Sequence, residues 1–437
     1  MSKEIKYKDT GIPYCPQIPE SWNVKRLKFV GKSIIGITYN PTQVTDEENG
    51  KLVLRSSNVQ NGVLSFEDNV YVNSEISEKH LSKEGDILIC ARNGSAHLVG
   101  KCAYIPKEYE GLTFGAFMLM FRSEFGKFMY YVFNSNLFKS QTGLYKTSTI
   151  NQLTSDTINN LFVALPSSKN EQEIIAQYLE EKSTQIDNII ERKQKLIEYL
   201  KEERIVIINQ VVSKGLNLNV EMKQTDIEWI GEIPKHWECI KFNHYVFLKH
   251  GFQFRDNDFT TSGIKIVKIT QLKPDGSLNT SNASFIDESR INDFKEIVIE
   301  NGDILMALTG GTIGKIVRAS GITETLLQNY RVGNFFPTSK KLEKDFLFWV
   351  LSSQVILGQL FFAQRETGQP NIGKEDFSRM KFALPPTKEQ IDIAKFLTNE
   401  NEKFEIAISK ITKEIELIAE YKSSLINEVV TGKILLN

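Results

Sequence analysis

Apolar residues alternate at steps of three and four along two stretches of the chain. In the first stretch these positions hold Ile186, Ile190, Lys193, Ile197, Leu200, Arg204, Ile207 and Val211. The pattern returns 218 residues later as Phe404, Ile408, Ile411, Ile415, Ile418, Lys422, Leu425 and Val429. A mean spacing of 3.5 residues over about four heptads is typical of a coiled-coil seam, and two matching seams can supply each other's partner. An amphipathic helix packed on its own domain is the alternative.

Both seams have a cation at an equivalent position, Arg204 in the first and Lys422 in the second. We expect each side chain to lie along the seam and to place its charge in solvent. A role in fixing the register of the helices is the alternative. Both helical stretches follow prolines, Pro166 in the first case and the pair Pro385-Pro386 in the second, and proline ends any preceding regular element.

The segments that precede the prolines have a mixed pattern. Short apolar runs bounded by Gly, Asn and Ser predict strands at residues 51–54, 86–90, 117–122, 263–270, 303–308 and 330–336. One helix is expected near the end of each mixed segment, at residues 125–139 and 345–361. The predicted fold class is therefore α+β, with two mixed α/β domains and two long helices.

The two halves of the chain are copies of one another. Lys8-x-Thr10-x-Ile12, Ile18-Pro19 and Trp22 recur 215 residues later, and Gly85-Asp86-Ile87-Leu88 recurs as Gly302-Asp303-Ile304-Leu305. Ala164-Leu165-Pro166, Glu171-Gln172 and Ile208-Asn209 recur in the same order in the second half. A period of this length indicates a duplicated domain pair rather than a solenoid. We expect four segments, at residues 1–165, 166–220, 221–385 and 386–437.

Composition excludes several classes of protein. The chain has 437 residues, 41% of them hydrophobic and 24% charged, which is ordinary for a globular protein of two to four domains. It has no apolar run long enough for a membrane span and no signal peptide at its start, and its four cysteines have neither zinc nor disulfide spacing. We therefore expect a cytoplasmic protein with reduced thiols and no membrane partner. The net charge of −1 gives no overall basic excess.

Motifs for catalysis are missing. The chain has neither the glycine-rich cofactor loop nor the Asn-Pro-Pro-Tyr-like loop of an adenine methyltransferase. The stretch from Gly310 to Lys315 fails as a phosphate loop, because Thr309 and Ile316 stand where Gly and Ser or Thr are needed. The histidines show no zinc spacing. An enzyme that acts alone is therefore not expected.

Three repeated elements together resemble one family, the DNA specificity subunits of type I restriction–modification systems. They are Ile-Pro-x-x-Trp at 18–22 and 233–237, Gly-Asp-Ile-Leu followed by a Gly-Lys turn, and Leu-Pro with Glu-Gln leading into a long helix. The resemblance covers almost the whole chain, in the order typical of the family. The second half fits better, since the first has one extra residue before Glu171 and departs from the pattern at 91–101 and near Phe114.

The resemblance implies two pseudo-symmetric target recognition domains, each reading half of a bipartite site in double-stranded DNA, with the helices forming an antiparallel coiled coil between them. It also implies two methyltransferase subunits docked on the helices, and motor-nuclease subunits in the full complex. S-adenosylmethionine, ATP and magnesium would then belong to those partners, with no cofactor in this chain. The seams of 26 residues, about 39 Å long, would set the unread gap between the half-sites.

Base readout needs Arg, Asn, Gln, Ser and Thr side chains on loops that reach the grooves. The first half offers Arg55, Ser56, Ser57, Asn58, Arg92, Asn93, Lys146, Thr147 and Ser148. The second half offers Lys268, Thr270, Gln271, Thr309, Arg331, Gln364, Arg365 and Gln369. Trp22 and Trp237 are expected to pack inside their domains rather than to stack on bases.

Two other interpretations stay open on the sequence. The chain could be a coiled-coil interaction scaffold that carries two sensor domains and binds no DNA. It could also be a fragment of a fused methyltransferase, which would need a cofactor loop that the sequence lacks.

Overall fold

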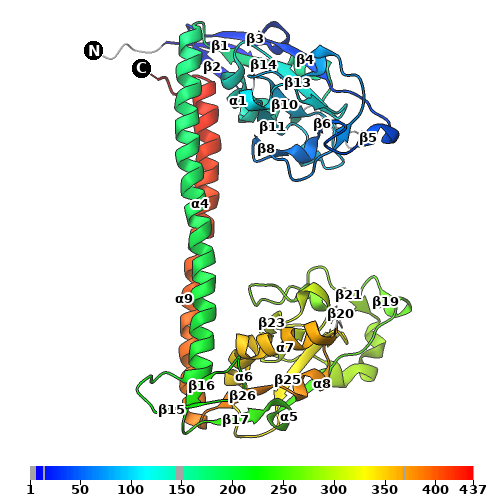
Figure 1. The fold of residues 1–437 in the computed structure, drawn as a ribbon, viewed down its shortest axis with the longest axis vertical. Helices are drawn as coiled ribbons and strands as arrows, with labels where there is room; N and C mark the ends of the chain where they lie inside the picture. The colour runs from blue at the N-terminus through cyan, green and yellow to red at the C-terminus, as the bar shows by residue number, and fades with distance from the viewer. Residues whose placement is uncertain (1–5, 13–14, 144–151, 368–370, 437) are drawn as a thin grey trace. The chain divides into compact units, whose positions relative to one another are not determined.

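The computed structural model describes residues 6–12, 15–143, 152–367 and 371–436, with the side chains of 363–367 left out (Figure 1). The chain forms two compact units. Unit 1 consists of residues 1–194 and 412–437, and unit 2 of residues 195–411. Each unit mixes strands and helices, as the pattern predicted. The segment limits expected at 165, 220 and 385 stay a prediction.

Unit 1 is built on two four-stranded sheets. The first has the order β11-β10-β13-β4, from strands Cys102–Tyr104, Ile87–Cys90, Met118–Arg122 and Lys32–Ile35, all antiparallel. The second has the order β12-β6-β9-β5, from Thr113–Phe114, Lys51–Leu54, Tyr71–Val72 and Val44–Thr45. Three two-stranded sheets complete the unit: β1 (Tyr7–Ile12) with β2 (Cys15–Pro19), β3 (Asn23–Arg26) with β14 (Phe162–Leu165), and β7 (Val59–Gln60) with β8 (Val63–Leu64).

Unit 2 repeats the strand order of both four-stranded sheets, while the small sheet of β7 and β8 has no counterpart among its described strands. Its first sheet is β18-β25-β22-β23, from Val246–His250, Val332–Pro337, Ile304–Ala307 and Ile316–Arg318. Its second is β19-β21-β20-β24, from Phe259–Thr260, Ser284–Ile286, Ile264–Val267 and Leu326–Gln328. The small sheets pair β15 (Met222–Gln224) with β16 (Glu232–Pro234), and β17 (Glu238–Lys241) with β26 (Lys381–Leu384). The duplication seen in the sequence is thus a duplication of fold.

The repeated tryptophans tie the start of each domain to the start of its long helix. Trp22 is fully buried, and its indole Nε1 donates a hydrogen bond of 2.8 Å to Oε1 of Glu171. Trp237 does the same to Oε2 of Glu389 at 2.9 Å. Packing rather than base stacking is therefore their role. The glutamine after each glutamate donates to a proline carbonyl, Gln172 to Pro166 and Gln390 to Pro385.

The repeated Gly-Asp pair forms a turn before a buried strand. Gly85 and Gly302 both have φ of +88°, a conformation that glycine adopts without a steric penalty. The aspartate that follows is buried and accepts a backbone N–H three residues earlier, Lys83 N to Asp86 Oδ2 at 2.8 Å and Glu300 N to Asp303 Oδ2 at 3.0 Å. The motif therefore has a structural role in both units.

Each predicted single helix is a bent pair, which corrects the sequence prediction. Unit 1 has α1 (Gly126–Asn134) and α2 (Asn136–Gly143), and unit 2 has α6 (Lys344–Ser352) and α7 (Gln354–Thr367). Both breaks fall on a buried serine, Ser135 in unit 1 and Ser353 in unit 2. The hydroxyl of each serine donates a hydrogen bond of 2.6 Å to the backbone carbonyl three residues earlier. A serine hydroxyl that competes for backbone groups favours such a break. The short helices α3 (Ser155–Asn160), α5 (Phe242–Tyr245) and α8 (Lys374–Ser378) complete the set outside the long helices.

Two long helices, α4 (Lys169–Lys214) and α9 (Thr387–Val430), carry the predicted seams. Between residues 187 and 206 of α4, positions 190, 193, 197, 200 and 204 are half-buried and all others are exposed. Cross-helix ion pairs join Asp187 to Lys422 in unit 1 and Arg204 to Glu405 in unit 2, each at 2.7 Å. Within unit 1, Lys193 also pairs with Glu414, so residue numbers rise on α4 as they fall on α9, and the helices run antiparallel there.

These ion pairs correct the expectation for the two seam cations. Arg204 and Lys422 do not place their charges in open solvent, because each binds a carboxylate on the opposite helix. The two pairs are also related by the repeat, since Asp187 and Glu405 are 218 residues apart, as are Arg204 and Lys422. This arrangement agrees with the register-setting alternative.

Each unit is completed by the end of a long helix from the other sequence repeat. In unit 1, the end of α9 packs Leu425 and Val429 into the core that contains Trp22, and in Figure 1 this red segment lies beside the green start of α4. In unit 2, the end of α4 packs Val211 into the core around Trp237. The repeated asparagines also match, since Asn427 Oδ1 accepts from Leu137 N at the start of α2 and Asn209 Oδ1 from Gln354 N at the start of α7.

Candidate nucleic-acid interface

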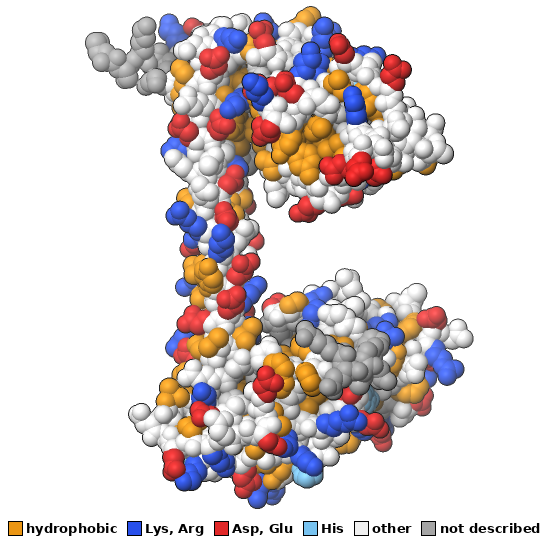
Figure 2. All heavy atoms as spheres, viewed as in Figure 1, with side chains coloured by type: hydrophobic (Ala, Val, Ile, Leu, Met, Phe, Trp, Pro, Cys, Tyr) orange, Lys and Arg blue, Asp and Glu red, His pale blue; other side chains and the backbone are white. Residues whose placement is uncertain are grey.

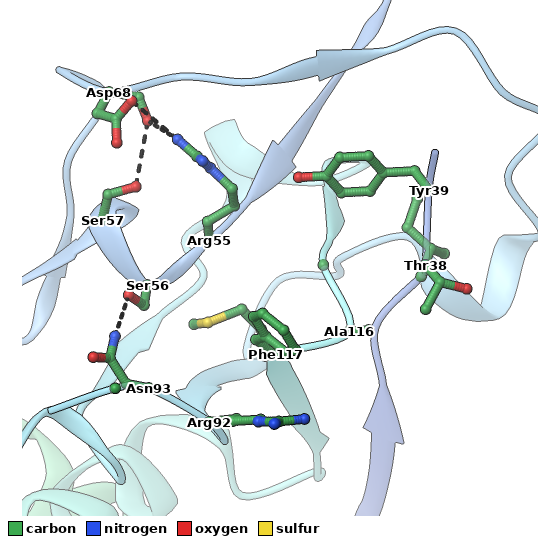
Figure 3. A pocket seen from close by; sticks show the side chains of 14 residues that line it. Thr38, Tyr39, Arg55, Ser56, Ser57, Asp68, Arg92, Asn93, Ala116 and Phe117 are labelled. Atoms are coloured by element: carbon green, nitrogen blue, oxygen red, sulfur yellow. Dashed lines mark hydrogen bonds and ion pairs between the residues drawn. The ribbon is translucent and has the colours of Figure 1, made fainter. Parts of the chain in front are cut away.

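A wide polar depression opens at one edge of the sheets of unit 1 (Figure 3). It has a volume of about 880 Å³. Its lining comes from the loops that follow β4, β6, β10 and β12, from the start of β13 and from Asp68: Ile37, Thr38, Tyr39, Arg55, Ser56, Ser57, Asp68, Arg92, Asn93, Gly94, Gly115, Ala116, Phe117 and Met118. Five of the residues predicted for the first half therefore lie together.

Arg92 and Phe117 face each other at the edge where β10 ends and β13 begins. The backbone N–H groups of Ala91 and Arg92 both donate to the carbonyl of Phe117, at 2.9 and 3.0 Å. This pairing places the guanidinium of Arg92 over the Phe117 ring, 5.3 Å from its centroid. Both side chains are exposed, Phe117 by 60%. The guanidinium of Arg92 is therefore held beside an aromatic ring at the surface, where both groups are exposed to solvent.

Hydrogen bonds and one ion pair among the lining residues shape this depression. Asn93 Nδ2 donates to the hydroxyl of Ser56 at 2.9 Å, and its Oδ1 accepts from Ser95 N. Arg55 forms an ion pair of 3.0 Å with Asp68, and Ser57 Oγ lies 3.5 Å from the Asp68 carbonyl (Figure 3). The guanidinium of Arg55 is therefore partly engaged within the chain, while that of Arg92 forms no ion pair with any of the described residues.

Asn58 does not reach solvent, which corrects its assignment as a base reader. Its side chain is fully buried, accepts from Arg55 N at 2.9 Å, and donates to the Ser65 carbonyl and to Asn69. It caps the short 3-10 turn Ser56–Asn58. Gln271 of unit 2 is its counterpart, being 4% exposed and accepting from Lys268 N at 3.0 Å. Both amides hold a loop in place rather than contact a ligand.

Lys268 of unit 2 takes the place of Arg55. Its ammonium donates to Ser284 Oγ at 2.7 Å and lies 4.1 Å from the centroid of the Phe259 ring. Partial burial lowers the pKa of Lys268, and the nearby carboxylate of Asp256 offsets this in part. The strand expected at 263–270 accordingly ends at Val267, because Lys268 begins a 3-10 turn that Gln271 caps. Thr270, in that turn, is exposed.

Arg331 and Thr309 occupy the edge of unit 2 that corresponds to Phe117 and Arg92. The equivalence follows from strand register, because Leu308 N donates to the Arg331 carbonyl at 2.9 Å, as Ala91 N does to Phe117. Thr309 is 9% exposed, so its access to a ligand is small. Arg331 is exposed, lies 5.3 Å from the Tyr330 ring centroid, and donates from Nε to the Tyr330 hydroxyl at 2.7 Å.

The remaining predicted residues cannot be placed. Lys146, Thr147, Ser148 and Gln369 lie outside the described residues. Gln364 and Arg365 belong to the last turns of α7, but their side chains are also outside the description.

Sequence reasoning missed the aromatic partners Phe117 and Tyr330. Each precedes or begins a predicted strand, where an aromatic residue is ordinarily counted as core. The sequence offered two signals: Phe117 stands at the start of a predicted strand, and Tyr330 stands next to Arg331. The contact of Arg92 with Phe117 depends on the strand register, which the sequence does not show. Tyr39 likewise lines the depression of unit 1 and was not predicted.

The charge pattern is mixed, and the described residues offer no metal centre. On the face drawn in Figure 2, basic and acidic side chains are interspersed over the surface, in keeping with the net charge of −1.

Among described residues, no group of three or more His, Cys, Asp or Glu side chains is arranged to hold a metal. In the same residues no single helix is long and apolar enough to cross a membrane, and only the bent pair α6 and α7 passes the same test jointly.

The family comparison matches both halves of the chain. The model of the type I restriction modification DNA specificity domain matches residues 19–199 and again residues 234–417. These two ranges contain both edges described above, and together they account for most of the sequence.

Curated relatives match over nearly the whole length. The type I restriction enzyme MjaVIII specificity subunit of Methanocaldococcus jannaschii is 29% identical over 432 residues, covering 96% of this chain and 94% of the relative. The type I restriction enzyme EcoKI specificity subunit of Escherichia coli is 24% identical over 396 residues, and the match covers 87% of this chain and 82% of the relative.

Solved structures show the same fold at low sequence identity. A chain from a study of complex assembly and conformational transition of the type I R-M system has a TM-score of 0.71 and 13% identity, covering 95% of this chain and 99% of that one. The HsdS subunit from Thermoanaerobacter tengcongensis has a TM-score of 0.50 and 14% sequence identity, and the match covers 95% of this chain and 98% of that one.

Proposed function

The chain belongs to the family of type I restriction–modification DNA specificity proteins, and we propose from this that it is the subunit that selects the DNA sequence for a type I complex. Each half-chain reads one half of a bipartite target in double-stranded DNA. The chain is not catalytic alone. Methylation and cleavage depend on methyltransferase and motor-nuclease subunits that bind to it.

The observation that carries this proposal is the duplication of a DNA-specificity domain. Both halves match the same family model, and both have the same strand order, with an exposed arginine at the equivalent edge of the sheet. Two copies of one reading domain in one chain suit a target with two separate parts. A scaffold that binds no DNA would have no need for polar edges of this kind in both units.

The helices α4 and α9 have two roles in the proposal. They set the length of the unread gap between the half-sites, and they provide the docking region for two methyltransferase subunits. S-adenosylmethionine, ATP and magnesium belong to the partner subunits, and this chain holds none of them. The chain is expected to act in the cytoplasm, where its DNA target and its partners meet.

Selection from a random duplex library tests the proposal. The full chain is co-purified with the methyltransferase subunits of its own system and incubated with the library at a fixed salt concentration, because phosphate contacts make binding salt-dependent. Recovered sequences are expected to share a motif of two fixed parts with an unread gap between them. The methyltransferase subunits without this chain are the control and should recover no motif.

Two outcomes would contradict the proposal. A scaffold would give no enriched sequence with or without its partners. An enzyme that acts alone would bind S-adenosylmethionine, so calorimetry on the isolated chain should detect no binding at micromolar concentrations.

A further inference from the structure

Each unit has one exposed arginine lying on an aromatic ring at the same edge of its first sheet. In unit 1 the pair is Arg92 on Phe117, and in unit 2 it is Arg331 on Tyr330, both 5.3 Å from guanidinium carbon to ring centroid. The strand register makes the two places equivalent, since Phe117 and Arg331 accept corresponding backbone hydrogen bonds. The arginine comes from the end of β10 in unit 1 but from the start of β25 in unit 2.

This equivalence is hidden from a comparison of the two repeats position by position. Arg92 aligns with Thr309, and Arg331 aligns with Phe117, so neither arginine is repeated in the sequence. An arginine beside an aromatic ring nevertheless occurs at this place in both units, although only Arg331 also forms a hydrogen bond with its ring residue, from Nε to the Tyr330 hydroxyl. A packing residue would gain nothing from such a replacement, because both guanidinium groups are on the outside of the domain.

The aromatic ring fixes the plane of the guanidinium group. A cation over an aromatic face is attracted by the ring quadrupole, and arginine stacks with its flat face against the ring. The N–H donors lie on the edge of the guanidinium. In Arg331 one of them, Nε–H, is bound to the Tyr330 hydroxyl at 2.7 Å, so the two terminal Nη groups are the donors that would contact a base. Among the described residues neither Arg92 nor Arg331 forms an ion pair, whereas Arg55 in the same depression is bound by Asp68.

A guanidinium group whose N–H donors are held in one plane is better suited to bind guanine than any other base. Guanine presents two acceptors, O6 and N7, side by side in the major groove, and a bidentate arginine is the commonest specific contact to it. Adenine presents a donor beside N7, and would face the fork with one repulsive contact. A phosphate group can also accept two N–H donors, but it would not require a fixed plane.

We propose that Arg92 and Arg331 are the guanine-reading residues of their units, each contacting O6 and N7 of one guanine in its own half-site. The inference rests on the proposed function and adds the base that each unit reads. Phe117 and Tyr330 act as positioning residues, because they hold the guanidinium plane without touching the base.

The test compares Arg92→Lys with the unchanged chain in the random duplex selection, using the full chain with its methyltransferase subunits. Lysine keeps the positive charge and loses the planar fork. The expected result is that one G·C pair in one half-site loses its preference, by roughly 5- to 150-fold against other pairs. The other half-site should be unchanged, and Arg331→Lys should give the reciprocal result.

Arg26→Lys is the matched control. It makes the same chemical change at an exposed arginine of unit 1 that also lies on an aromatic ring, 5.4 Å from the Phe162 centroid, but outside the depression. Its selected motif should keep that G·C pair. Phe117→Leu should weaken the same preference as Arg92→Lys, by a smaller factor, and a thermal melt of each variant confirms that unit 1 stays folded.

The outcomes separate this inference from the proposed function. If the unchanged complex selects no two-part motif, the proposed function fails. If it selects one and Arg92→Lys leaves every position as selective as before, the guanine assignment is wrong. A uniform loss of affinity in Arg92→Ala, with no change in selected bases, would show a phosphate contact instead.

Discussion

Single residues explain why the repeated motifs are repeated. The indole of Trp22 has no access to water, so its N–H depends on the carboxylate of Glu171 for a hydrogen bond. That bond fastens strand β2 and the following turn to the first turn of α4, and Trp237 with Glu389 does the same in unit 2. A buried N–H donor without a hydrogen-bond partner lowers the stability of the fold, so both members of each pair are needed.

Glu171→Ala should destabilise unit 1. It leaves the buried indole N–H without its partner, and hydrogen bonds to charged groups are worth about 1.5–3 kcal/mol. The free energy of unfolding, measured by urea denaturation, should fall by about that amount. Glu173→Ala, an exposed glutamate in the same helical turn, is the control and should change it by less than about 0.5 kcal/mol. Equal effects would show that the Trp22 contact contributes nothing specific.

His250 gives unit 2 a dependence on pH. Burial lowers the pKa of His250 from its ordinary value of 6.5, a hydrogen bond with the Tyr330 backbone opposes this, and Lys374 adds to the lowering. The unfolded chain therefore binds a proton at a pH where the folded chain does not, so the free energy of unfolding rises with pH through this range. Stability should increase as pH is raised from about 5 to 7 and then level off.

Thermal melts across that pH range provide the measurement. His250→Gln should flatten part of the slope. Burial lowers the pKa of His80 in unit 1 as well, so part of the slope should remain. A slope that is unchanged in His250→Gln would show that this histidine does not titrate as described.

At the scale of elements, the cross-helix ion pairs fix how α4 and α9 meet. Asp187 with Lys422 and Arg204 with Glu405 are related by the repeat, so the same polar contact recurs in both units. The apolar seam alone would tolerate a shift by one heptad, because its positions are nearly all Ile, Leu or Val. A charge at one defined position in each unit disfavours such shifts.

Lys422→Glu should weaken unit 1, because it places a carboxylate against Asp187. The pair is partly exposed, so the expected loss is small, about 0.5–1 kcal/mol in the free energy of unfolding. Adding Asp187→Lys restores an opposite-charge pair and should recover most of the loss. A double-mutant cycle with no coupling between the two positions would contradict a role for the pair.

Elements were predicted better than their boundaries or their contacts. Period and repeat located the long helices and the strands Ile87–Cys90 and Ile304–Ala307, because buried strands and seams have strong apolar patterns. The breaks at Ser135 and Ser353 were missed, since a serine inside an apolar helix has no signal until its hydroxyl partner is known.

The candidate site was predicted only in part, for a physical reason. Residue type identified the arginines, but it could not separate exposed Arg92 from buried Asn58, because burial depends on the packing of distant strands. Nor could it place Phe117 beneath a guanidinium from another strand.

At the scale of the whole molecule, the length of the antiparallel helices should control the gap between half-sites. Sequence equivalence would match an insertion after Leu200 with one after Ile418. The ion pairs of Lys193 with Glu414 and Arg204 with Glu405 show instead that Leu200 faces α9 near Ile408. A matched insertion therefore belongs after Leu200 and after Ile408, and seven residues in each helix keep the heptad pattern.

Such an insertion adds about 10 Å of helix and should lengthen the unread gap by about three base pairs. Methylation profiling or duplex selection with the full complex measures the gap directly. The two half-sites should keep their sequences, because neither edge changes. An unchanged gap with altered half-sites would show that the helices do not determine the spacing.

The exchange of helix ends between the repeats also has a consequence for synthesis. Unit 2 is one continuous segment, residues 195–411, and its parts leave the ribosome together. Unit 1 starts first but needs residues 412–437, and the core around Trp22 includes Leu425, Val429 and Val430. The apolar face that these residues cover stays open until residues 412–437 have been made. Of the two units, the one that is started first is therefore the last to finish folding, and a chain interrupted between residues 411 and 425 would leave unit 1, rather than unit 2, exposed to aggregation.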